Sequence, residues 1–163
     1  MAPSMTSAPT TPLSSTKQRI AEHIVDGVIT TRDLATKTGL SANTIRLYVR
    51  HIRESVHCPP RCKPQVLVHL LLAAQQVAPP APEQLAPELN AQQQLLLKAV
   101  AEHSAPRDIA LAARIAPADL RPALDELLTA AGAADVTRLV VMAHAWGLLA
   151  VRSAGTAESG ANQ

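Results

Sequence analysis

The chain has 163 residues, with 15 lysines and arginines against 13 aspartates and glutamates, and a formal net charge of +2. It has one Trp, one Tyr and no Phe, so its cores must be built from Leu, Val, Ile and Ala, which favours helices. The sequence lacks a glycine-rich phosphate loop, an alternating strand pattern and an apolar run of about 18 residues, which argues against nucleotide-binding, all-β and membrane-spanning classes.

The N-terminal segment, residues 1–12, is rich in Pro, Ser and Thr and has neither a cationic start nor an apolar block. It is expected to be a flexible arm and not a signal peptide, which places the protein in the cytoplasm. The next segment predicts a packing helix: Ser15 and Gln18 have the form of a capping box, Ile20 and Ile24 continue an apolar face, and Gly27 ends it.

Residues 31–41 predict a short capped helix followed by a tight turn. Ala35 is a small residue where two helices would cross closely, and Gly39 stands where the turn requires a positive φ. Ser41 then caps a second helix over residues 42–54. This order is typical of a helix-turn-helix, and the expected DNA-reading element is the second helix.

Two faces are expected on the helix over residues 42–54. Ile45, Val49 and Ile52 form an apolar stripe, while Arg46, Arg50 and Arg53 line another face at the same spacing. The alternative for an isolated helix of this kind is a solvated surface helix without a ligand. The upstream turn favours DNA, and we expect Lys17, in the packing helix, to contribute little to binding.

The following segment contains Cys58 and Cys62, which we expect to be reduced and incidental, because three candidate ligands with His57 fall short of a zinc set. Pro64 can open a further helix that extends to about Gln76 and is almost wholly apolar, which indicates a partner surface. Residues 77–88 are proline-rich and predict a semi-rigid linker.

The plan repeats over residues 89–152, at a shift of 75 residues between Ala35 and Ala110. The second copy keeps the apolar positions but loses the basic face: Arg114 replaces the turn glycine, Ala123 replaces Tyr48, and the face that carried arginines now holds Asp119, Asp125 and Glu126. Pro122 predicts a helix that starts late, near Asp119, or is kinked. A last helix is expected over 135–146, and residues 153–163 are expected to be a disordered tail.

Charge is distributed unevenly between the two copies. Residues 13–73 hold nine basic against four acidic residues, a net charge of +5, whereas residues 89–152 hold six of each. The first half therefore carries the electrostatic pattern expected of a phosphate-binding surface.

Both halves resemble the LuxR-type (GerE-like) helix-turn-helix domain of bacterial transcription regulators. The resemblance lies in residues 33–52 of the first half and in residues 132–149 of the second, which is similar to that family's last loop and fourth helix. It implies an all-α fold of two tandem four-helix helix-turn-helix domains, 13–76 and 89–152, the second degenerate, joined by the proline-rich linker. It also implies a location at the bacterial nucleoid.

The resemblance also implies which residues contact DNA and which form a pairing surface. Base-edge contacts are implied for Arg46, Leu47 and Arg50, and backbone contacts for Thr44, Tyr48 and Arg53. The full expected DNA-binding set is Thr31, Ser41, Asn43, Thr44, Arg46, Leu47, Tyr48, Arg50 and Arg53. The family's fourth helix is its usual dimer seam, which implies a pairing or partner surface of Val66, Leu67, Leu70, Leu71, Leu139, Met142 and Trp146.

These patterns predict a sequence-specific regulator that binds double-stranded DNA in the major groove, as a homodimer or as an internal pseudo-dimer. A second hypothesis is an adaptor that contacts another regulator or RNA polymerase and binds DNA weakly or not at all. The scattered histidines give no catalytic arrangement, so an enzyme, a metal site and a cofactor are not expected.

Overall fold

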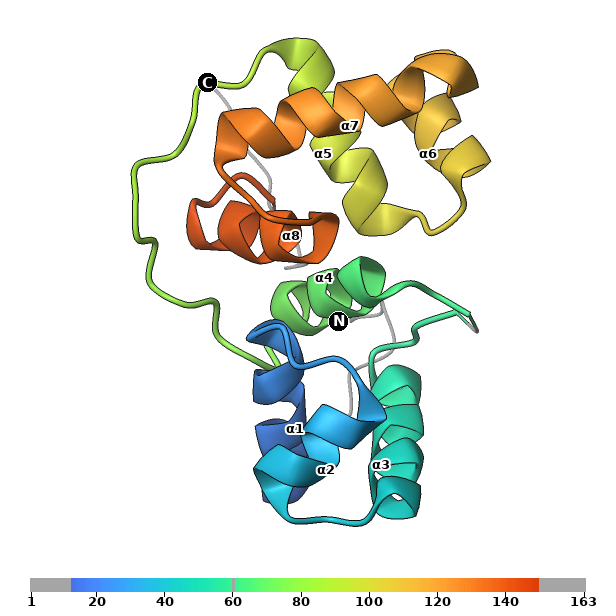
Figure 1. The fold of residues 1–163 in the computed structure, drawn as a ribbon, viewed down its shortest axis with the longest axis vertical. Helices are drawn as coiled ribbons and strands as arrows, with labels where there is room; N and C mark the ends of the chain where they lie inside the picture. Colours follow the sequence, from blue (N-terminus) through green and yellow to red (C-terminus); the bar gives the residue numbers. More distant parts are fainter. Residues whose placement is uncertain (1–12, 60, 150–163) are drawn as a thin grey trace, which may run out of the picture.

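The computed structural model describes residues 13–59 and 61–149, and over these residues it is all-helical, which confirms the expected class (Figure 1). The described residues form eight helices and no strand. The helices are α1 (Ser15–Val25), α2 (Thr31–Thr38), α3 (Ala42–Ser55), α4 (Pro64–Ala73), α5 (Ala91–Glu102), α6 (Pro106–Ala113), α7 (Pro117–Ala131) and α8 (Val136–Ala145). The predicted arm, the predicted tail and residues 150–152 lie outside the described residues.

Local capping chemistry sets where the first helices begin. The N-cap of α1 is Ser14, whose side chain accepts from the Lys17 N–H, so the expected capping box at Ser15 is wrong by one residue. Gln18 is not part of a capping box, because its side-chain amide nitrogen donates to the backbone carbonyl of Gln76, across the first half, at 2.6 Å. This long-range bond attaches α1 to the segment that follows α4.

The turn between α2 and α3 has the predicted chemistry. Gly39 adopts φ 77° and ends α2 with its N–H on the Ala35 carbonyl, and Ser41 caps α3 by accepting from the Thr44 N–H at 3.1 Å. Thr30 caps α2 in the same way, through the Asp33 N–H. Together these caps satisfy backbone N–H groups at the starts of α2 and α3, and the Gly39 N–H satisfies a carbonyl at the end of α2, before the short turn that leads to α3.

The second half repeats the helix lengths and spacing of the first. Helices α2 and α6 each have eight residues and start 75 residues apart, and each ends on a left-handed residue, Gly39 or Arg114. Helix α7 runs from Pro117 through Pro122, so the first of the two alternatives expected from Pro122, a late start near Asp119, is wrong; the second, a kink, stays a prediction. Pro117 opens the helix, where a missing N–H costs nothing, and Pro122 removes one bond from the second turn.

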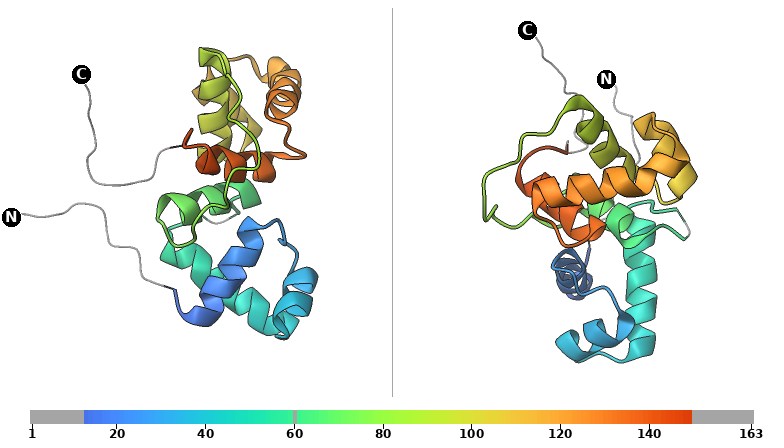
Figure 2. Two further views of the ribbon diagram at one scale, coloured as in Figure 1. Left: turned by 90° about the vertical axis from the view of Figure 1, so that its left-hand side faces the viewer. Right: turned by 45° about the horizontal axis from the view of Figure 1, so that its top comes forward.

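Two helices join the halves. Helix α4 packs on α8 and also contacts α1 and α5, so it lies at the centre of the molecule (Figures 1 and 2). The buried side chains of both halves form one continuous cluster. The apolar surplus of α4 is thus covered by the second half of the same chain.

The segment predicted as a linker lies on the second half. The Trp146 indole N–H donates to the Gln84 carbonyl at 2.8 Å, and the Gln84 amide donates to the Ala131 carbonyl at 3.1 Å. Val77 is buried, whereas Leu85 is almost fully exposed. The two hydrogen bonds hold the segment on the ends of α7 and α8 at Gln84.

Within the described residues, no single helix combines the length and apolar composition needed to cross a membrane, although the bent pair α7 and α8 meets that test jointly.

The two left-handed turn residues give a matched stability prediction. Gly39→Ala should lower the free energy of unfolding by about 1 kcal/mol, because alanine is strained at positive φ even though open space surrounds Gly39. Arg114→Gly should raise it by about 0.5–1 kcal/mol, because it relieves the same strain at φ 63°. Urea unfolding of both variants measures the changes, and equal signs would contradict the shared geometry.

Candidate nucleic-acid interface

Helix α3 has one buried and one solvent-facing side. Ile45 and Ile52 are completely buried against α1 and α2, whereas Arg46 and Arg50 are exposed. Leu47, between them in sequence, is 40% exposed. The exposed side therefore offers two exposed cations and one apolar contact to a ligand.

The exposed side is partly ordered by its own side chains. The Arg46 guanidinium donates to the side-chain Oδ1 of Asn43 at 2.7 Å, one turn earlier. This bond fixes the direction of Arg46 without removing its charge. Asn43 thus orients the Arg46 side chain, and its own side chain is also exposed to solvent.

The start of α3 holds the predicted polar residues together. The Ser41 hydroxyl accepts from the Thr44 N–H and donates to the Thr44 hydroxyl at 2.9 Å. Ser41 is exposed and Thr44 is half-buried, while Thr31 begins α2 and is half-buried. The structure brings Ser41, Asn43 and Thr44 to the same end of α3.

Tyr48 lies beside a cation from another helix. The Lys17 ammonium is 5.8 Å from the centre of the Tyr48 ring, within the range of a cation–π contact. Lys17, which the sequence placed in the packing helix and which was expected to contribute little to binding, therefore lies next to this surface, because α1 packs directly on α3. Arg19 is exposed and lies about 200° further round α1, which makes it the better control position.

Arg53 differs from the other two arginines. Its guanidinium donates to the carbonyl oxygen and the Sγ of Cys62, both at 3.2 Å, and the side chain is half-buried. Arg53 therefore contacts the loop after α3 in addition to bordering the exposed side.

The equivalent side of α7 has the opposite character. Asp119, Asp125 and Glu126 are all exposed, and Arg121 is the exposed cation among them. A surface of this charge would repel phosphates. The basic surface is therefore confined to the first half.

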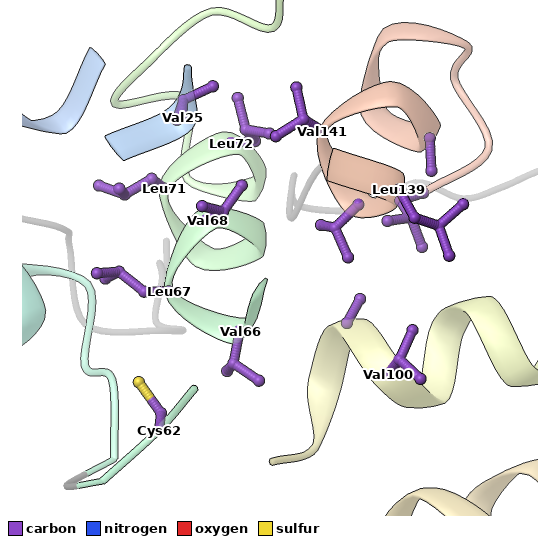
Figure 3. Close-up of a cluster of buried hydrophobic side chains, with 14 of the residues drawn as sticks. Val25, Cys62, Val66, Leu67, Val68, Leu71, Leu72, Val100, Leu139 and Val141 are labelled. Carbon is purple, nitrogen blue, oxygen red and sulfur yellow. The ribbon is translucent and has the colours of Figure 1, made fainter. Parts of the chain in front are cut away.

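The predicted pairing residues fall into three groups. Val66, Leu67, Leu71 and Leu139 are buried inside the chain (Figure 3). Leu70 is half-buried and lines an open groove between α4 and α5. Met142 and Trp146 border the segment 80–84 on the other side of α8, so they do not belong to the contact between α4 and α8.

The contact between α4 and α8 is reciprocal. His69, the sixth residue of α4, meets His144, the ninth of α8, with ring nitrogens 2.9 Å apart. Conversely, Leu72, the ninth residue of α4, points toward Val141, the sixth of α8 (Figure 3). Such exchange of positions is the property of an approximate twofold, isologous interface.

The histidine pair at this contact is largely shielded from water. His69 is 7% and His144 8% exposed, and one ring nitrogen must donate while the other accepts. Burial, and next the neighbouring His69, lower the pKa of His144 from 6.5 to about 4. His144 is therefore neutral at neutral pH.

Because of this histidine pair, we expect the free energy of unfolding to fall in acid as the contact between α4 and α8 is weakened. As the pH falls from 6.5 to 4, the unfolded chain protonates His144 before the folded chain does, so stability present above pH 6.5 is lost, by up to about 3 kcal/mol. Urea unfolding at pH 7 and 4.5 should show this loss in wild type and in the His23→Gln control, but much less of it in His144→Gln. Identical pH dependence in all three proteins would contradict the assignment.

The cysteines depart from the expectation. Cys58 and Cys62 form a disulfide, so the prediction of reduced cysteines is wrong for this structure. The described residues contain no group of three or more His, Cys, Asp or Glu side chains arranged to hold a metal ion. Sequence reasoning also missed the histidine pair, because the two residues are not at equivalent positions of the repeat: His69 is the sixth residue of α4 and His144 the ninth of α8.

Comparison with family models, with curated proteins and with solved structures found no match to this chain.

Proposed function

We propose that this chain is a sequence-specific DNA-binding regulator of transcription, with α2 and α3 as a helix-turn-helix and α3 in the major groove. The observation that carries the proposal is the exposed side of α3, where Arg46 and Arg50 face solvent while the opposite side is buried. Each arginine has the geometry to donate two bonds to one guanine. The glycine turn and the Ser41 cap hold this helix in a fixed position relative to α2.

The proposal includes an internal pairing of the two halves as a pseudo-dimer. It is supported by the reciprocal contact between α4 and α8, which buries the apolar residues of α4 within one chain. With this surface covered, the chain acts as a monomer with one basic reading helix. The degenerate second half then serves as a permanent partner of the first.

The test is selection from randomised duplex DNA with the intact protein at near-physiological salt. The proposal predicts enrichment of one short motif, because only the first half has a basic reading surface. Absence of any enriched motif would contradict it and favour the adaptor function. The exposed acidic residues of α7 would then be the first surface to test against another regulator or RNA polymerase.

A further inference from the structure

The loop between α3 and α4 differs from its counterpart in the second half. Five residues separate the left-handed His57 from the N-cap Lys63, whereas two separate the left-handed Gly132 from the N-cap Asp135. The first half thus has three extra residues here. The disulfide Cys58–Cys62 closes this longer loop.

The loop contacts three separate parts of the molecule. Arg53 of α3 donates to Cys62, Cys62 is buried in the shared core, and the Lys63 N–H donates to the Ser104 hydroxyl of the second half at 2.9 Å. His57 and Arg61 adopt positive φ without being glycine, a backbone conformation that an ordinary residue adopts only under constraint. A change at the disulfide would therefore affect α3 and the second half together.

The two sulfurs are not equivalent. Cys58 is half-buried, whereas Cys62 is 6% exposed, so we expect a thiol to attack at Cys58. The Arg53 guanidinium lies 3.2 Å from the Cys62 Sγ. A cation at that distance stabilises the negative charge that develops on a departing sulfur, which accelerates thiol–disulfide exchange.

We propose that Cys58 and Cys62 form a redox-active modification site, reduced reversibly by low-molecular-weight thiols, with Arg53 assisting the departure of the Cys62 sulfur. A thiolate RS⁻ attacks the Cys58 Sγ, the S–S bond breaks, and its electron pair leaves on the Cys62 Sγ. This step gives a mixed disulfide RS–S on Cys58 and a thiolate on Cys62. A second RS⁻ then attacks the RS sulfur, which releases RSSR and the Cys58 thiolate. Two thiolates are oxidised, and the protein disulfide takes up two electrons.

Disulfides in reducing compartments are usually transient and redox-sensing, which is the role that this site would fill. The consequence for the fold is local. Reduction releases the constraint on His57 and Arg61, so the end of α3 and the start of α4 open more often. The corresponding junction between α7 and α8 has no disulfide and is unaffected.

The test uses the full chain, oxidised with glutathione disulfide and then exposed to millimolar glutathione without denaturant. Alkylation and mass spectrometry give the rate at which two thiols appear. Arg53→Gln should slow reduction by about three- to tenfold, because the departing sulfur loses its cation, while Arg53→Lys should restore most of the rate. Arg50→Gln removes the same charge one turn away and should leave the rate unchanged.

Three results would overturn the proposal: failure of the pair to oxidise, reduction that requires denaturant, or equal rates in Arg53→Gln and Arg50→Gln. Hydrogen exchange of the reduced and oxidised wild type supplies a second readout. Exchange should become faster in residues 54–66 on reduction and stay the same in residues 130–138, and unchanged exchange in both would contradict the structural consequence. None of these readouts uses DNA. The proposed redox site and the proposed DNA-binding function are therefore tested independently of each other.

Discussion

The double variant Arg46→Ala/Arg50→Ala should lose at least about 30-fold in affinity for the selected DNA site and nearly all of its preference for that site over random duplex. Both side chains are exposed on α3, and neither contacts the core, so the fold should be unchanged. Each arginine that bonds a guanine is worth about 1–3 kcal/mol of discrimination. Fluorescence anisotropy with the selected and a scrambled duplex measures both quantities.

The control is Arg19→Ala, which removes the same charge from an exposed position on α1. It should lower affinity for both duplexes equally and by no more than about threefold, as a distant phosphate-attracting charge does. Lys17→Ala is a third arm: because Lys17 lies over Tyr48, we expect a measurable loss of affinity. Equal losses from Arg19→Ala and the double variant would contradict the assignment of α3 as the reading helix.

The contact between α4 and α8 gives the second large effect. Val141→Asp should lower the free energy of unfolding by about 3–5 kcal/mol, because it places an unpaired carboxylate in a fully buried position opposite Leu72. Since the halves share one core cluster, wild type should unfold in one transition and the variant in two, one for each half. Chemical unfolding followed by circular dichroism and by Trp146 fluorescence tests this, because Trp146 reports the second half.

Leu111→Asp supplies the matched control, since Leu111 is 77% exposed on α6. Its free energy of unfolding should change by no more than about 0.5 kcal/mol. A wild-type protein that unfolds in two independent transitions would show that the halves are not coupled. Equal stability of the two aspartate variants would show that the contact is not formed in solution.

The local features of the site were predictable from the sequence because each depends on residues that are close together along the chain. Gly39 and Ser41 specify a turn and a cap within three positions, and the spacing of Ile45 and Ile52 fixes the buried side of α3. The N-cap of α1 was predicted one residue too late, because two adjacent serines can both cap the helix and the one that does so is Ser14. Pro122 misled the prediction because α7 tolerates the loss of one hydrogen bond near its start.

The long-range features were not predictable in the same way. The apolar excess of α4 indicated that something covers it, but composition does not distinguish a second chain from α8 of the same chain. His69 and His144 are separated by 75 residues, and they become a pair only when the register of α4 against α8 is known. The pairing of Cys58 and Cys62 depends on loop geometry and redox state, and the number of cysteines specifies neither.

The most direct measurement is the number of chains bound to the selected duplex, determined by native mass spectrometry of the intact complex. A chain whose pairing surface is covered by its own second half should bind as one copy of 17.2 kDa on a single short motif. Two copies on a site with two related halves would contradict the proposal that the chain acts as a monomer with one basic reading helix.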